Sequence, residues 1–276
     1  MTQQAQDTSR PALLTIAVAL VTLVFWAFEP ALGAEFVSLD DPRNLVQNHA
    51  FRGLGGEHLS WMFSTAHMSH YQPLTWISFA IDHELAGLNA GAFHFTSVLL
   101  HAAATLAFFL LALVLLRRCV PGTRALLGSG LAAACFGLHP LRVESVAWIT
   151  GRNDILAGLF AFLCAAAWVR HGESHPSPKL EPGKWLPALA CAGLSVLLVF
   201  SSVELGSAGR ISMRGLGFFG LGLALMLWFK SLRYAQQACG VHKLGRWLPL
   251  ALVCFLLSLL SKASAVTLPA VLLLLD

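Results

Sequence analysis

The chain has 276 residues, of which 57% are hydrophobic and only 12% are charged, and its mean hydropathy is +0.69. Soluble domains carry about 25% charged residues, so this composition excludes an ordinary soluble globular protein. The apolar residues form blocks suited to membrane-spanning helices, which need about 20 residues, and they lack the alternation typical of a membrane β-barrel. The net charge of +4 comes mainly from basic residues in short loops, so it does not indicate nucleic-acid binding.

Apolar blocks predict the membrane-spanning helices in chain order. The first covers residues 11–28, as a retained span or a cleaved signal peptide, and the polar loop 30–89 follows it outside the cytoplasm. The other predicted spans are residues 90–116, 125–138, 155–169, 185–203, 215–229 and 247–260, with a last apolar run from Val266 to Asp276. The remaining loops alternate in basic content, which places the N-terminus in the cytoplasm. We therefore predict an all-α fold, a polytopic membrane helix bundle with about seven to eight spans.

The loop 30–89 contains an acidic pair, Asp40 and Asp41, in the string Phe-Val-Ser-Leu-Asp-Asp-Pro-Arg-Asn-Leu. An Asp-Pro step is ordinary turn chemistry, so a solvated turn is one interpretation. The other is a general base near the membrane surface, because paired carboxylates favour holding one proton between them. The aromatic stretches 61–63 and 74–79 in the same loop predict short helices lying on the membrane surface.

The densest polar group between two predicted spans covers residues 139–154. Its charged members are Arg142, Glu144, Arg152 and Asp154. In one interpretation these charges neutralise one another, because ionisable side chains at membrane depth need partners. In the other they form a phosphate clamp, since the planar donors of Arg match phosphate oxygens. Lys262, a lone cation at the outer end of a span, either extends to the interface or supplies a second phosphate contact.

Metal and nucleotide motifs are weak in this sequence. His67 and His70 lie three residues apart, but no carboxylate stands at a matching spacing, so we predict no metal site. None of the six cysteines forms a C-x-x-C motif, so neither a disulfide nor a zinc site is expected. The glycine motif Gly215–Gly220 lies in an apolar span with no preceding strand, which favours close helix packing over nucleotide binding.

Several strings occur in an order that resembles a known family. They are Tyr-Gln-Pro-Leu-Thr-Trp-Ile (71–77), Leu-His-Pro-Leu-Arg-Val-Glu-Ser-Val-Ala-Trp (138–148), Gly-Arg-Asn-Asp-Ile-Leu (151–156) and the final apolar run, all after the acidic pair. The chain resembles the membrane part of the transmembrane and tetratricopeptide-repeat proteins, in their bacterial version, and the family is similar to glycosyltransferases of the GT-C fold. The resemblance covers nearly the whole chain, residues 1–276, as one GT-C-like transmembrane domain.

The resemblance implies protein O-glycosylation of the O-mannosylation type, outside the cytoplasm and without a cofactor, although a divalent metal stays open. A polyprenyl-phosphate sugar in the bilayer would be the donor, and a Ser or Thr hydroxyl of a translocated protein the acceptor. The implied catalytic bases are Asp40 and Asp41. The implied donor-phosphate contacts are Arg152, Lys262 and Arg142. The implied supporting residues are His139, Glu144, Asp154 and Gln72.

The sequence also departs from the family pattern. Gln72 stands where many members carry a charged residue, Ala263 follows the outer lysine, and two extra spans are predicted between residues 170 and 247. No tetratricopeptide repeat is visible, and the last apolar run is cut off, so we expect an N-terminal part of a longer protein. The expected location is a bacterial inner membrane. A non-catalytic membrane anchor for a repeat domain is the alternative function, and a transporter is disfavoured because the polar residues concentrate in outer loops.

Overall fold

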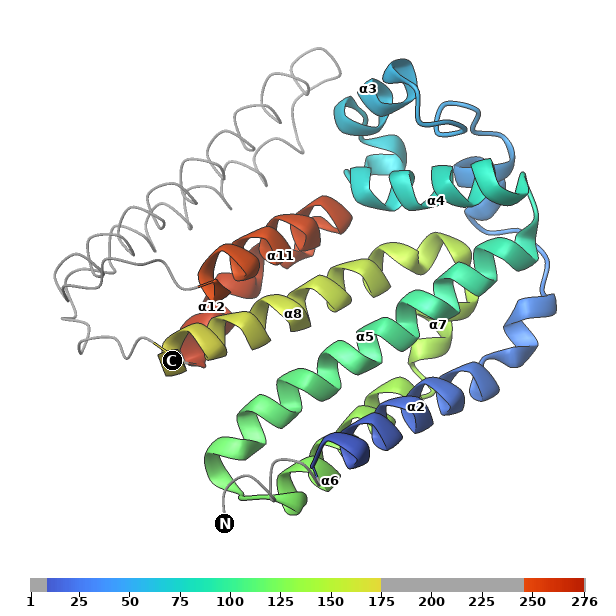
Figure 1. Ribbon diagram of the computed structural model, residues 1–276. Helices are drawn as coiled ribbons and strands as arrows, with labels where there is room; N and C mark the ends of the chain where they lie inside the picture. The colour runs from blue at the N-terminus through green and yellow to red at the C-terminus, as the bar shows by residue number, and fades with distance from the viewer. Residues whose placement is uncertain (1–8, 175–245, 276) are drawn as a thin grey trace, which may run out of the picture. The chain divides into compact units, whose positions relative to one another are not determined.

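The computed structural model describes residues 9–174 and 246–275, and every element in these ranges is helical (Figure 1). The longer helices are α2 (Ser9–Ala27), α5 (Ala90–Cys119), α6 (Thr123–Gly137), α8 (Arg152–Ser174) and α11 (Trp247–Ser261). The chain divides into two compact units, and the first comprises Met1–His171 with Arg246–Asp276. Of the second unit, Gly172–Gly245, the structure describes only residues 172–174, at the end of α8. The all-α prediction is confirmed for the described residues.

Three stretches of helix are long and apolar enough to cross a membrane: residues 10–27, 90–119 and 149–174. α11 is apolar but has 15 residues, and α6 also has 15, so both are shorter than the 20 or so residues of a typical span. The spans predicted at 185–203 and 215–229 lie outside the described residues. A membrane protein with at least three candidate spans is therefore supported, while the total of seven to eight and the cytoplasmic N-terminus stay predictions.

The first three long helices pack together through small residues. A Cβ atom added to Gly137 of α6 would lie 2.8 Å from the side chain of Thr105 in α5, and one added to Gly130 would lie 3.0 Å from Ile16 in α2. Helices approach this closely only where one partner lacks a side chain. His101 of α5 completes the contact, because its Nε2 lies 2.9 Å from the carbonyl oxygen of Gly137. These contacts hold the end of α6 against the middle of α5.

The connection between α2 and α5 is folded. It contains the 3₁₀ turn Glu29–Gly33, the π-type turn Pro42–Val46, α3 (Gly56–Ser64), the 3₁₀ turn His67–Ser69 and α4 (Pro73–Ala86). The predicted short helices at 61–63 and 74–79 are thus present as parts of α3 and α4. Trp76 and Phe79, however, are fully buried against Phe51, Phe93 and Ile149. These two rings form a protein core instead of facing a membrane surface, since α5 and the start of α8 cover them.

The predicted polar turn before α8 is partly helical. Residues Arg142–Ala147 form α7, and a 3₁₀ turn, Ile149–Gly151, leads directly into α8 at Arg152. α8 therefore begins three residues before the predicted start at residue 155. The correction matters because Arg152, Asn153 and Asp154 belong to the first turn of a helix, which gives their side chains defined directions. α11 is followed by the 3₁₀ turn Ala263–Thr267 and by α12 (Leu268–Leu274).

Candidate functional site

The start of α8 and the 3₁₀ turn directly before it contact several segments that are distant in sequence. Thr150 is bonded to Asp41, Arg152 pairs with Asp82, Asn153 is bonded to Gln72, and Asp154 pairs with Lys262. These contacts reach the α2–α5 connection, α4 and the end of α11. A stretch of five residues thus holds together the elements that carry most of the predicted site.

Asp41 is fully buried and its carboxylate is occupied by protein donors. The Oδ2 atom accepts a hydrogen bond from the backbone N–H of Val37 at 2.9 Å. The Oδ1 atom accepts from Thr150 twice, from its backbone N–H at 3.2 Å and from its hydroxyl at 2.6 Å. Hydrogen bonds to a charged acceptor are the stronger kind. Asp41 therefore anchors the acidic loop to the 3₁₀ turn before α8. It acts as a positioning residue.

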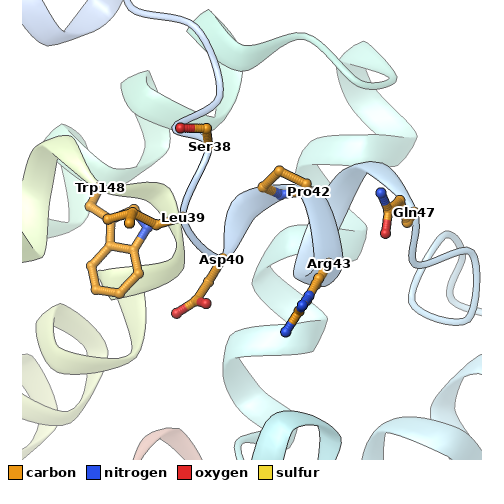
Figure 2. Close-up of a pocket in the computed structure, with 7 residues that line it drawn as sticks. All are labelled: Ser38, Leu39, Asp40, Pro42, Arg43, Gln47 and Trp148. Atoms are coloured by element: carbon orange, nitrogen blue, oxygen red, sulfur yellow. The ribbon is translucent and has the colours of Figure 1, made fainter.

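Asp40 has a different environment, at the edge of a cavity of about 500 Å³ (Figure 2). The cavity is lined by Ser38, Leu39, Asp40, Pro42, Arg43, Gln47 and Trp148. Figure 2 shows the carboxylate of Asp40 between the indole of Trp148 and the side chain of Arg43. The carbonyl of Asp40 accepts from the N–H of Asn44 at 2.9 Å, so the turn that begins at Pro42 fixes its backbone. Asp40 is the member of the acidic pair that a ligand in this cavity can reach.

Arg152 is fully buried among protein groups. Its Nη1 forms an ion pair with the Oδ2 of Asp82 at 2.6 Å, and its Nη2 donates to the carbonyl of Phe93 at 2.6 Å. Its Nε donates to the hydroxyl of Ser97 at 3.1 Å, and the guanidinium carbon lies 4.5 Å from the centre of the Phe79 ring. These contacts satisfy a buried charge in the way that such charges require. The guanidinium does not line the Asp40 cavity, and the predicted phosphate contact by Arg152 stays a prediction.

Asp82 is the important residue that the sequence analysis did not single out. It lies in α4, three residues after the buried Phe79, so both side chains fall on the face of α4 that packs inward. A carboxylate on the buried face of an otherwise apolar helix signals a buried partner. Burial raises the pKa of Asp82, although the charge of Arg152 acts in the opposite direction. The hydroxyl of Thr96 also donates to its Oδ1 at 2.7 Å.

Two of the predicted supporting residues take part in the contacts at the start of α8. Gln72, directly before α4, is buried, and its Oε1 accepts from the Nδ2 of Asn153 at 2.9 Å. Asp154 forms an ion pair with Lys262, the residue that directly follows α11. Both of these side chains are partly exposed, at 46% for Asp154 and 32% for Lys262. The hydroxyl of Ser258 donates to the carbonyl of Ala157 at 2.8 Å, which aligns α11 with α8.

The other predicted residues lie around α7. The guanidinium carbon of Arg142 is 5.0 Å from the centre of the Phe136 ring, and Arg142 and Asp154 line a second cavity of about 40 Å³. His139 is exposed, and its Nδ1 accepts from the N–H of Leu141 at 3.2 Å. Glu144 is exposed in the first turn of α7. The structure thus separates the predicted set into residues at the Asp40 cavity, residues bonded to the start of α8, and residues around α7.

Within the described ranges, no group of three or more His, Cys, Asp or Glu side chains is arranged to hold a metal ion. His67 lies with its Nε2 3.3 Å from the carbonyl oxygen of Arg43, and its ring packs against Trp61 and Trp76. The ring of His67 therefore supports the acidic loop by contacting the backbone of Arg43. The expectation that no metal takes part stays a prediction, and the glycine motif 215–220 lies outside the described residues.

Comparison with known proteins shows which proteins this chain is similar to. The chain is 36% identical over 138 residues to the protein O-mannosyl-transferase TMTC2 of Mus musculus, and 35% identical over 138 residues to that of Homo sapiens. It is 32% identical over 189 residues to the protein O-mannosyl-transferase Tmtc2 of Drosophila melanogaster. The aligned regions cover 49%, 49% and 63% of this chain. They cover only 15%, 15% and 19% of the relatives' own lengths.

No family model matches the chain, and no solved structure matches it. The homologues are thus named protein O-mannosyl-transferases, in agreement with the resemblance seen in the sequence motifs. The GT-C fold and the bacterial version stay predictions, since the relatives named above are animal proteins. The similarity concerns part of this chain and a small part of each relative, so the activity of the whole relatives is not carried over as a fact.

Proposed function

We propose that this chain is the catalytic membrane part of a protein O-glycosyltransferase. The donor is a polyprenyl-phosphate sugar, with mannose as the first candidate because the relatives are named O-mannosyl-transferases. The acceptor is a Ser or Thr hydroxyl of a protein on the outer face of the membrane. The proposal is supported mainly by the different environments of the two neighbouring carboxylates, Asp40 and Asp41. One is buried as an anchor, and the other lines an open cavity.

The proposed reaction uses Asp40 as the general base. The hydroxyl oxygen of the acceptor attacks the anomeric carbon while Asp40 removes its proton. The bond between the anomeric carbon and the phosphate oxygen breaks, and its electron pair stays on the phosphate. Asp41 holds the loop through Val37 and Thr150, so the base is already positioned before the substrates bind.

The predicted cations take separate roles in this proposal. Lys262 and Arg142 are partly exposed but do not line the Asp40 cavity, so we propose them as secondary contacts of the donor phosphate. Arg152 is assigned to positioning, since its charge is compensated by Asp82 and its donors are directed to Phe93 and Ser97. Gln72, Glu144, His139 and Asp154 are proposed to support the same end of α7 and α8.

The test is the Asp40→Asn variant in the full chain, assayed with polyprenyl-phosphate mannose and a Ser/Thr-containing acceptor peptide. We expect transfer to fall by about 100-fold or more, because general-base catalysis contributes a factor of that order. The thermal unfolding temperature should stay unchanged, since the carboxylate has no partner among the described residues. Glu84→Gln, which removes an exposed carboxylate of α4, is the matched control and should retain full transfer.

Unchanged transfer by Asp40→Asn would show that Asp40 is not the base. Transfer that is absent from the unaltered chain, in a membrane preparation where the protein is folded, would favour the alternative of a non-catalytic anchor.

A further inference from the structure

The Asp40 cavity contains a cation that the motif analysis did not assign. Arg43 lies three residues after Asp40, in the turn Pro42–Val46, and its side chain lines the same cavity. Figure 2 shows the side chains of Asp40 and Arg43 extending in the same direction from this turn. Neither side chain has a hydrogen-bond or ion-pair partner within residues 9–174 and 246–275, and Arg43 is exposed.

The other cations near this end of the helices are already engaged. Arg152 is buried with Asp82, and Lys262 is paired with Asp154. Arg142 lies over the Phe136 ring and lines the small second cavity. None of these three lines the Asp40 cavity. A guanidinium that faces a ligand-sized space without a protein partner is available to an anion.

The backbone around Arg43 is held in place from two sides. Asp41 anchors the preceding residues to Thr150, and the carbonyl oxygen of Arg43 lies 3.3 Å from the Nε2 of His67. The N–H of Gln47 donates to the carbonyl of Pro42 at 2.8 Å, which closes the turn. The side chain thus extends from a fixed backbone, so binding an anion orders the side chain and not the loop.

We propose that Arg43 binds the phosphate group of the polyprenyl-phosphate donor in the Asp40 cavity. The inference rests on the proposed function, and it names the cation nearest in the chain to the proposed base. The two planar donors of Arg43 face two phosphate oxygens, while Asp40 faces the acceptor hydroxyl. Trp148 also lines the cavity, and Figure 2 shows its indole on the side of Asp40 away from Arg43.

The reaction itself makes this contact stronger as it proceeds. The donor phosphate is a diester with one negative charge, and the leaving polyprenyl phosphate is a monoester that approaches two. The additional charge develops on the oxygen that leaves the anomeric carbon. A cation fixed beside that oxygen stabilises the transition state more than the bound donor. Loss of Arg43 is therefore expected to lower kcat in addition to raising the KM for the donor.

The experiment measures binding, independently of sugar transfer. The full chain is placed in nanodiscs of neutral lipid, and its affinities for farnesyl phosphate and for farnesol are compared. The unaltered chain should prefer the phosphate. Arg43→Gln should weaken phosphate binding by at least about tenfold, because a charge-assisted hydrogen-bond pair is lost. Arg43→Lys should lie between the two, since it keeps the charge and loses the planar fork.

The matched control is Arg124→Gln, which removes an exposed arginine from the first turn of α6, at the opposite end of α5 and α6 from the site. It should leave phosphate binding unchanged. Equal affinities of Arg43→Gln and the unaltered chain, or no preference of the unaltered chain for phosphate over alcohol, would overturn the inference. A specific loss in Arg43→Gln supports it even if no transfer is found, and in that case the proposed function alone fails.

Discussion

At the residue scale, two neighbouring carboxylates differ through their surroundings and not through their chemistry. Asp41 is enclosed and accepts three hydrogen bonds from Val37 and Thr150. Asp40 borders a cavity and keeps its oxygens available. A buried, fully bonded carboxylate stabilises a fold, whereas a carboxylate that a substrate can touch is suited to proton transfer. The acidic pair therefore combines a positioning residue with a proposed base.

The two roles predict opposite effects of the same substitution. Asp41→Asn places an amide nitrogen where an oxygen now accepts a hydrogen bond, and it removes the charge that strengthens the other bonds. We expect the free energy of unfolding to fall by about 2 kcal/mol, given the cost of leaving buried donors unsatisfied. The measurement is thermal or denaturant unfolding of the purified chain in detergent.

Asp40→Asn serves as the comparison and should unfold like the unaltered chain. The two variants together separate stability from catalysis. An Asp41→Asn chain as stable as the unaltered one would contradict the anchoring role.

At the element scale, the start of α8 decides how α4 and α5 pack. Arg152 crosses from α8 to Asp82 of α4 and to Phe93 and Ser97 of α5. The rings of Phe79 and Phe93 flank its guanidinium at 4.5 Å and 5.6 Å. Because Arg152 and Asp82 are both buried, the ion pair acts as a directional link between three helices. Removing one partner leaves a buried charge, and removing both does not.

The ion pair yields a prediction from two variants. Arg152→Met leaves Asp82 buried without its counter-charge, and we expect a loss of about 3–5 kcal/mol in unfolding free energy at neutral pH. The double variant Arg152→Met with Asp82→Leu should recover most of that loss, because no buried charge remains. Unfolding of both variants in detergent gives the comparison. A double variant that is no more stable than Arg152→Met would contradict this explanation, because the loss would then not come from the unpaired charge of Asp82.

The loss in Arg152→Met should also depend on pH. Burial raises the pKa of Asp82, and only Arg152 and the hydroxyl of Thr96 oppose this effect appreciably. Without Arg152, the folded chain holds the Asp82 proton more tightly than the unfolded chain, whose aspartates titrate near a pKa of about 3.9. The variant is therefore least destabilised below that value, and it loses stability as the pH rises above it.

At the scale of the whole molecule, the Asp40 cavity and the α5–α6 turn lie at opposite ends of α5. The cavity is formed by the α2–α5 connection and by Trp148, whereas Cys119 ends α5 at the other side. A helix of 30 residues, at 1.5 Å per residue, is about 45 Å long, enough to cross a bilayer. The two ends are thus expected on opposite sides of the membrane, with the cavity outside the cytoplasm.

Cysteine labelling in intact cells tests that orientation. In a chain whose other cysteines are replaced, Ser38→Cys should react with a membrane-impermeant maleimide before lysis, because Ser38 lines the exposed cavity. The native Cys119, which is exposed, should react only after lysis. The reverse pattern would place the N-terminus outside the cytoplasm and would contradict the proposed outer-face acceptor.

The sequence by itself determined the helical class, the three longest described spans and the acidic loop, because long apolar blocks and turn residues are local signals. It also identified the residues at the start of α8 as a group. Only the tertiary structure decided which member of the acidic pair is accessible, that Arg152 pairs with Asp82, and that Arg43 shares a cavity with Asp40. These facts depend on contacts between residues up to 109 positions apart, as between Asp41 and Thr150. Neither hydropathy nor spacing records such distances, because burial and pairing arise only when the helices pack.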